Sequence, residues 1–106
     1  KDLISSGGEN IYPAEIENIL NGHPAILEVA VIGMPHPRWG ESPRAVVVLR
    51  QDMQATEQAL IHYTREHLAH YKCPTSVVFT TQLPRNASGK LLKRELRRIY
   101  LEESST

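Results

Sequence analysis

Residues 26–49 read ILEVAVIGMPHPRWGESPRAVVVL. The two ends of this stretch, Ile26–Met34 and Arg44–Leu49, are rich in β-branched residues and have the length of buried strands. Three prolines fall between them, in residues 35–43, and prolines at this density are typical of a loop. The stretch therefore predicts two buried strands joined by a loop.

A short helix is predicted ahead of these strands. Pro13 suits the first turn of a helix, and Ile16, Ile19 and Leu20 form an apolar stripe before a glycine and a proline end the pattern. The segment before this helix, residues 5–10, reads SSGGEN and predicts a small-residue loop. Its paired glycines allow another molecule to approach the backbone closely.

The second half of the chain predicts a helix, a strand and a final helix. Thr56 suits the N-cap of the first of these helices, which must end before Pro74. Residues 76–80 predict a third strand, and the final helix buries Leu92, Leu96 and Ile99. We therefore expect an α+β fold, with a small sheet of at least three strands packed with about three helices, in one domain covering residues 1–106.

Composition limits the classes of function. The 106 residues, 41% of them apolar, can close one hydrophobic core. Lys plus Arg and Asp plus Glu both total 12, so no overall field favours nucleic acid or an anionic membrane. A single cysteine forms no internal disulfide, and no apolar run is long enough to span a bilayer. We expect a cytoplasmic protein, and the start at Lys1 without a leader indicates a piece of a longer chain.

The segment Asn86–Lys90 places a Gly-Lys pair ahead of the final helix, as a phosphate-binding P-loop does. Pro84 stands where a P-loop needs its first glycine, and Leu91 stands where it needs Ser or Thr. The phosphate cradle and the metal-binding hydroxyl are therefore missing. What is left is Lys90 on a flexible Gly-Ser loop, where its ammonium can reach an anion.

The sequence favours neither a metal site nor a nucleic-acid site. His67 and His70 are one helical turn apart, but no third ligand stands at a suitable spacing. The final helix is basic, yet its cations fall on the face opposite its apolar stripe, where solvated charges are ordinary. No aromatic residues alternate with those cations to stack on bases.

Two segments resemble motifs of one enzyme family. Residues 1–17, KDLISSGGENIYPAEIE, resemble the motif that begins the C-terminal domain of acyl-CoA synthetases of the adenylate-forming, AMP-binding superfamily. Residues 83–90, LPRNASGK, with KREL at 93–96, resemble the terminal catalytic-lysine motif of the same domain. The resemblance implies the C-terminal lid domain of an adenylate-forming enzyme, whose N-terminal adenylation domain is its partner.

The resemblance also implies a reaction in two steps. A carboxylic acid, a fatty or other hydrophobic one, attacks the α-phosphate of ATP to give an acyl-adenylate, and the thiol of CoA then displaces AMP. ATP and CoA are the implied substrates, and the implied Mg²⁺ is bound by the N-terminal domain. We expect the lid domain alone to be inactive.

Roles for individual residues follow from the resemblance alone. Lys90 matches the catalytic lysine, which the mobile domain brings to the carboxylate and phosphate in the first step. Lys1 and its neighbour Asp2 match the hinge on which the domain swings. Gly7 and Gly8 match the loop that lines the pantetheine channel in the second step.

Three further residues are implied for the nucleotide end of CoA. Tyr71 matches a surface that stacks on adenine, with Trp39 as a second candidate, and Lys72 matches a phosphate partner. This sequence has Cys73 where relatives carry an arginine after that lysine.

Two alternatives stay open. One is the same fold in an enzyme that loads a pantetheinylated carrier protein instead of free CoA, although residues 11–17 look more like fatty-acid ligases. The other is a basic nucleic-acid-binding module, with a salt-dependent affinity that does not depend on Lys90.

Overall fold

The computed structural model describes residues 2–104 and confirms the α+β fold. None of the helices in this range is both long and apolar enough to cross a membrane. The elements follow in the order β1 (Ile4–Ser6), β2 (Glu9–Ile11), α1 (Pro13–Asn21), β3 (Ile26–His36), β4 (Gly40–Leu49), α2 (Glu57–Arg65), the 3-10 turn η1 (His70–Lys72), β5 (Ser76–Phe79) and α3 (Lys93–Ser104).

The long antiparallel hairpin of β3 and β4 is the centre of the sheet. Pairing between the two strands extends from Ile26 opposite Leu49 to His36 opposite Gly40. The other edge of β4 is shared, since β1 meets it at Gly40 and β5 runs parallel to it from Arg44. β2 completes the sheet beside β1.

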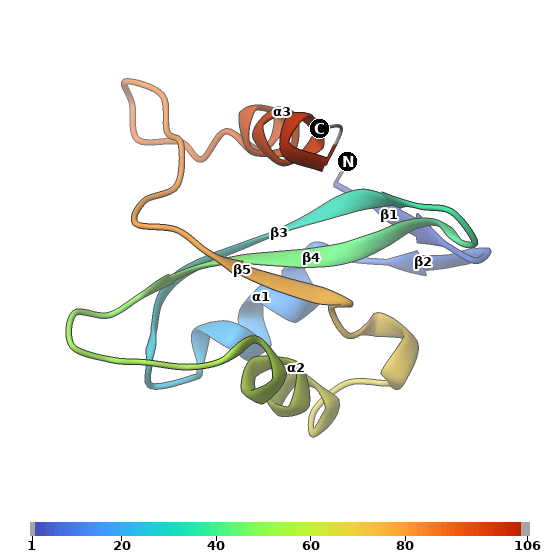
Figure 1. The fold of residues 1–106 in the computed structure, drawn as a ribbon, viewed down its shortest axis with the longest axis horizontal. Coiled ribbons are helices and arrows are strands. Elements are labelled where there is room, and N and C mark those ends of the chain that lie inside the picture. The colour runs from blue at the N-terminus through green and yellow to red at the C-terminus, as the bar shows by residue number, and fades with distance from the viewer. Residues whose placement is uncertain (1, 105–106) are drawn as a thin grey trace.

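Helices cover both faces of this hairpin, and Figure 1 shows α3 on one side of the sheet with α1 and α2 on the other. Side chains of a strand alternate between its faces. Val29 and Val31 accordingly belong to the core under α1 and α2, while Ala30 and Ile32 belong to the core under α3. Because both faces are buried, β3 and β4 read as nearly continuous apolar runs.

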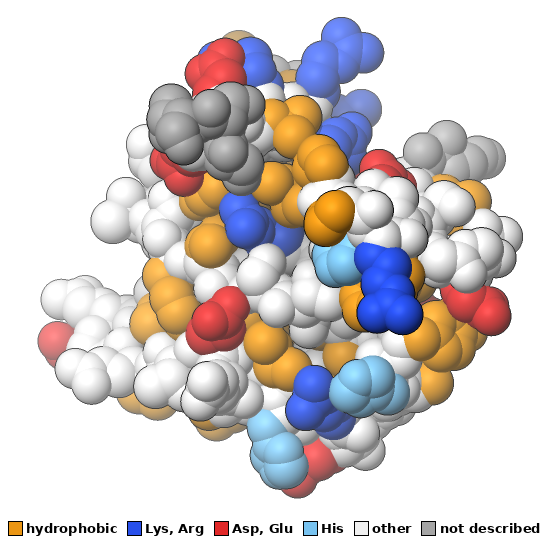
Figure 2. Space-filling view, turned by 45° about the vertical axis from the view of Figure 1, so that its right-hand side comes forward, with side chains coloured by type: hydrophobic (Ala, Val, Ile, Leu, Met, Phe, Trp, Pro, Cys, Tyr) orange, Lys and Arg blue, Asp and Glu red, His pale blue; other side chains and the backbone are white. Residues whose placement is uncertain are grey.

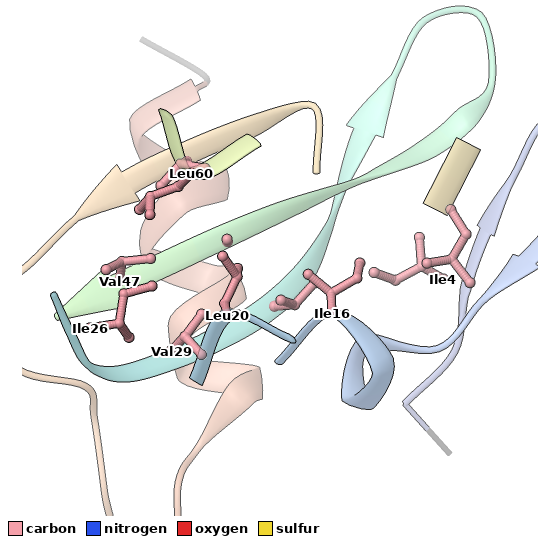
Figure 3. Close-up of a cluster of buried hydrophobic side chains, with 11 residues drawn as sticks. Ile4, Ile16, Leu20, Ile26, Val29, Val47 and Leu60 are labelled. Carbon is pink, nitrogen blue, oxygen red and sulfur yellow. The ribbon is translucent and has the colours of Figure 1, made fainter. Parts of the chain in front are cut away.

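The larger core lies between the sheet and the first two helices. Figure 3 shows Leu20 of α1 beside Val29, Leu60 of α2 near Val47, and Ile16 of α1 between Leu20 and Ile4, all in one cluster of buried side chains. On the opposite face, the core includes Leu83 from the segment after β5, with Leu96 and Tyr100 of α3. The predicted buried position of Leu96 is confirmed.

The loop predicted over residues 35–43 is much shorter in the structure. β3 continues to His36 and β4 starts at Gly40, so Pro35 and Pro43 both lie in paired strands. Proline lacks an amide donor, but its φ is compatible with extended backbone near a hairpin end. The prediction gave the prolines too much weight against the pairing on either side of them.

The loop predicted over residues 5–10 is a β-hairpin. Ser6 pairs with Glu9, and Gly7 and Gly8 between them have φ values of 57° and 84°. A two-residue hairpin turn with positive φ at both positions matches the twist of its strands and favours Gly-Gly. The glycines were therefore the signal for a turn, which the sequence prediction interpreted only as a loop.

The start of α2 follows the predicted N-cap. The Thr56 hydroxyl accepts a hydrogen bond from the Ala59 amide at 3.1 Å, as an N-cap should. The next residue, Glu57, accepts a hydrogen bond from the Val77 amide of β5 at 2.8 Å. The first turn of α2 is thereby tied to the sheet.

We predict that Leu20→Ala lowers the free energy of unfolding by about 2 to 5 kcal/mol, because the side chain is fully buried beneath the hairpin. Leu27→Ala is the matched control, since Leu27 is 50% exposed and its loss should cost about 0.5 kcal/mol or less. Equilibrium urea unfolding of both variants measures the difference. Equal costs at the two positions would contradict the observed core.

Candidate functional site

Lys90 lies at the end of a small turn between β5 and α3. Arg85 and Leu91 form a β-bridge that closes the segment, and Asn86 and Lys90 face each other inside it. The backbone amide of Asn86 donates to the backbone carbonyl of Lys90 at 3.0 Å, and the backbone amide of Gly89 donates to the backbone carbonyl of Asn86 at 2.9 Å. The backbone of this turn is therefore closed on itself.

The side chain of Asn86 fastens the turn from inside. Its Oδ1 atom accepts hydrogen bonds from the amides of Ser88 at 3.0 Å and Lys90 at 2.9 Å, and from the Ser88 hydroxyl at 2.8 Å. Gly89 takes a φ of 87°, which few other residues adopt without strain. The loop predicted to be flexible is instead a hydrogen-bonded turn.

The Lys90 side chain itself is exposed. Its ammonium makes no hydrogen bond or ion pair with any other residue in the range 2–104. The structure thus fixes the backbone under Lys90 and leaves the cation available to an external anion.

A cleft lies beside the turns of the β1–β2 and β3–β4 hairpins. Figure 1 shows these turns at the end of the molecule opposite to the segment between β5 and α3. The cleft has a volume of about 480 Å³. Three of the residues that the resemblance assigned to CoA line it together, namely Gly7, Trp39 and Tyr71. Gly8 stands next in the same turn and does not line the cleft.

Trp39 is held at the cleft from two sides. Its carbonyl accepts a hydrogen bond from the Gly7 amide at 2.8 Å, and its ring stacks on His36 with 4.3 Å between centroids. The Nδ1 atom of His36 accepts from the amides of Arg38 and Trp39. The indole is nevertheless 44% exposed, so it offers an oriented aromatic face to a ligand.

Tyr71 and Lys72 leave the short turn η1 in different directions. Tyr71 lines the cleft and is 47% exposed. Lys72 does not line it, because its Nζ atom lies 3.2 Å from Oε1 of Glu15 on α1. The hydrogen bond and the charge of Glu15 raise the pKa of Lys72.

Sequence reasoning missed two basic residues at the cleft. Arg65 ends α2 and His70 begins η1, and both line the cleft near Tyr71. Figure 2 shows basic and histidine side chains beside hydrophobic ones on this side of the molecule. No local motif marks these residues, since only the fold brings them to the β1–β2 turn. Cys73 also lines the cleft, although the residue is buried.

Of the two residues predicted to form a hinge, Lys1 lies outside the described residues and Asp2 contacts α3. The Asp2 carboxylate pairs with Lys93 and lies 3.6 Å from Arg97. Lys93 also lies 2.7 Å from Glu17 of α1, whose carboxylate accepts from the Val31 amide. Ion pairs thus hold Asp2 against α3, and Lys93 links it to Glu17 of α1.

The cations of α3 are mostly engaged by carboxylates of the domain. Besides Lys93 and Arg97, Arg98 pairs with Glu95 and Glu102 on the same helix. The hydrogen bond from Arg98 lowers the pKa of Glu95. Within residues 2–104, no three His, Cys, Asp or Glu side chains gather closely enough to hold a metal ion.

The family model for the AMP-binding enzyme C-terminal domain matches residues 15–90. The chain belongs to this family. The match includes the Gly89-Lys90 end of the turn and the Trp39 and Tyr71 positions at the cleft.

Relatives of this AMP-binding enzyme C-terminal domain are CoA ligases. The chain is 55% identical over 102 residues to a 2-succinylbenzoate–CoA ligase of Bacillus cytotoxicus, covering 96% of this chain and 21% of that protein. It is 49% identical over 110 residues to the peroxisomal benzoate–CoA ligase of Arabidopsis thaliana, covering 93% and 19%. The solved fatty acyl CoA synthetase of Mycobacterium tuberculosis has a TM-score of 0.88 and 49% identity, covering 93% and 20%. The chain spans about a fifth of the length of these relatives.

We predict that Glu15→Gln lowers the pKa of Lys72 towards its ordinary value, because the variant removes the carboxylate that stabilises the ammonium. An NMR titration of the Lys72 ε-methylene signals measures the change. Glu9→Gln is the control, since Glu9 is an exposed carboxylate at the cleft and makes no ion pair with the described residues. An unchanged titration in Glu15→Gln would show that the ion pair is not formed in solution.

Proposed function

We propose that residues 1–106 are the mobile C-terminal domain of an ATP-dependent ligase that joins a carboxylic acid to CoA through an acyl-adenylate. The observation that carries the proposal is Lys90, an exposed ammonium without a partner among residues 2–104, standing on a turn whose backbone is fixed. Family membership and the CoA-ligase relatives support it. ATP, the acid and Mg²⁺ bind to the N-terminal adenylation domain, which is the partner of this domain.

In the first step, Lys90 brings positive charge to two anions that must meet, the carboxylate and the α-phosphate. An ammonium about 4 Å from an anion at an effective dielectric constant near 20 contributes on the order of 4 kcal/mol. If the contact forms mainly in the transition state, it accelerates the step roughly a thousandfold. Lys90 acts here as a fixed cation and transfers no proton.

In the second step, the cleft receives CoA. Pantetheine is a thin chain with amide groups, and the Gly7-Gly8 turn lets it pass close to the backbone without meeting a side chain. Trp39 and Tyr71 offer exposed aromatic faces for adenine, and the cleft carries Arg65 beside them. Lys72 becomes a phosphate partner when an anion competes with Glu15 for its ammonium.

The positions of the two sites support a domain that swings. The Lys90 turn and the CoA cleft lie at opposite ends of the molecule, whose longest dimension is 38 Å (Figure 1). A single catalytic centre in the N-terminal domain therefore meets them one at a time. Lys1 and Asp2, where the chain enters the domain, are the proposed hinge.

The acid is proposed only as a class. Relatives are named for benzoate, 2-succinylbenzoate and fatty acids, which share a carboxylate and an apolar body. A fatty or other hydrophobic acid is therefore our proposal. The cytoplasmic location stays a prediction, and two relatives are named peroxisomal.

Two variants of the full-length enzyme should separate the two steps. We predict that Lys90→Ala slows pyrophosphate release from ATP and acid by about a hundredfold or more, because it removes a transition-state cation. The same variant should form CoA thioester from pre-made acyl-adenylate at the wild-type rate. Trp39→Ala should show the reverse pattern, with pyrophosphate release unchanged and the KM for CoA raised about tenfold by the loss of a stacking surface.

Each variant serves as the control for the other, since both change an exposed side chain of the same domain. Unchanged pyrophosphate release in Lys90→Ala would refute the role of Lys90. If either variant slowed pyrophosphate release and thioester formation equally, the Lys90 turn and the cleft could not be assigned to separate steps.

A further inference from the structure

The guanidinium of Arg85 joins the Lys90 turn to the central sheet. Its NH1 nitrogen donates a hydrogen bond to the Gly89 carbonyl at 3.0 Å. Its NH2 nitrogen pairs with the carboxylate of Glu28, which stands near the start of β3. One side chain thus connects two points 61 residues apart in sequence, Glu28 and Gly89.

The Gly89 carbonyl belongs to the peptide group that carries Lys90. The amide of the same peptide group is the Lys90 N–H, which donates to Oδ1 of Asn86 at 2.9 Å. Both polar ends of this peptide group are therefore held, one by Arg85 and one by Asn86. Because a peptide group is planar, holding both ends fixes the plane from which the Lys90 side chain starts.

Gly89 makes this restraint necessary. Its φ of 87° lies in a region where glycine meets little steric resistance, and a Cβ added there would meet nothing within 4 Å. Gly89 has no side chain, and no neighbouring atoms pack against it, so sterics do not prevent the backbone from rotating at this point. The hydrogen bonds from Arg85 and to Asn86 supply the restraint.

We infer that Arg85, oriented by Glu28, is a positioning residue that fixes the direction of Lys90 for the adenylation step. The inference rests on the proposed role of Lys90 and names two residues that act through it. A guanidinium is suited to the task because its planar fork donates in two directions at once, whereas the ammonium of a lysine is a compact point charge. Glu28 supplies the fixed point, since it pairs with Val48 of β4, directly after a bulge at Leu27, and the pairing continues from there to the hairpin turn.

Stabilisation of the domain is a separate and smaller effect. The side chains of Arg85 and Glu28 are 43% and 30% exposed, and exposed ion pairs stabilise proteins little. Catalysis is more sensitive, because a misplacement of about 1 Å at a reacting group can cost as much as a hundredfold in rate. Loss of Arg85 should therefore appear in the rate of one step and hardly in the melting temperature.

The test uses the full-length enzyme with Arg85→Met, Glu28→Gln and the double variant. We expect kcat for pyrophosphate release to fall about tenfold in Arg85→Met and severalfold in Glu28→Gln, with the KM values for ATP and acid within about twofold. The double variant should be no slower than Arg85→Met, because Glu28 acts through Arg85. Thioester formation from pre-made acyl-adenylate should be unchanged in all three. Arg85→Lys should recover at most part of the rate of pyrophosphate release that Arg85→Met loses, and should stay below the wild-type rate.

Arg98→Met and Glu102→Gln are the matched controls. They make the same changes of charge at an exposed ion pair on α3 that does not touch the Lys90 turn. Both should release pyrophosphate at the wild-type rate. A loss in these controls equal to that in Arg85→Met would attribute the effect to charge in general and overturn the inference.

The inference and the proposed function can fail separately. If Lys90→Ala abolishes pyrophosphate release and Arg85→Met does not slow it, the positioning role is wrong and the function stands. If Lys90→Ala does not slow pyrophosphate release, the proposed function is wrong, and the positioning role that rests on it is wrong as well. An additive double variant, or equal losses in both steps with a lowered melting temperature, would also contradict positioning through Glu28 and Arg85.

Discussion

The burial of the β3–β4 hairpin on both faces is the constraint on which the rest of the structure depends. Val29 and Val31 face α1 and α2, and Ala30 and Ile32 face α3, so one pair of strands organises two cores. A shift of one residue in the register of either strand would exchange the two faces. The helices α1 and α3 and the strands β1 and β5 contact this hairpin directly, whereas α2 packs on β5 and α1, and β2 pairs with β1.

The same hairpin connects the two candidate sites. At its turn, Trp39 lines the cleft with its ring stacked on His36, and near its open end Glu28 anchors Arg85 beneath the Lys90 turn. The eight steps from Glu28 to His36 span about 26 Å at about 3.3 Å per residue. A rigid element of that length keeps the two sites apart, so a rotation of the whole domain can exchange one for the other.

Much of the fold could be predicted from the sequence, because burial on both faces and helix caps leave local patterns. The apolar runs at 26–34 and 44–49 and the cap at Thr56 are such patterns, and the α+β fold is confirmed. The extension of the strands through Pro35 and Pro43 was missed, since pairing between β3 and β4 outweighed the local preference of the prolines. The network around Lys90 was also missed, because Glu28 and Arg85 are brought together only by the folded sheet. Gly7, Trp39 and Tyr71 were identified through the resemblance, and their gathering at one cleft required the structure.

The central claim, that the two ends of this domain meet one catalytic centre in turn, is tested most directly by distances. Spin labels at Ser88, beside Lys90, and at Glu9, beside the cleft, can each be paired in separate samples with a label near the nucleotide site of the full-length enzyme. With ATP bound, the Ser88 label should lie nearer the nucleotide site than the Glu9 label. With acyl-adenylate analogue and CoA bound, the order should be reversed. Distances that stay the same in both states would contradict the account.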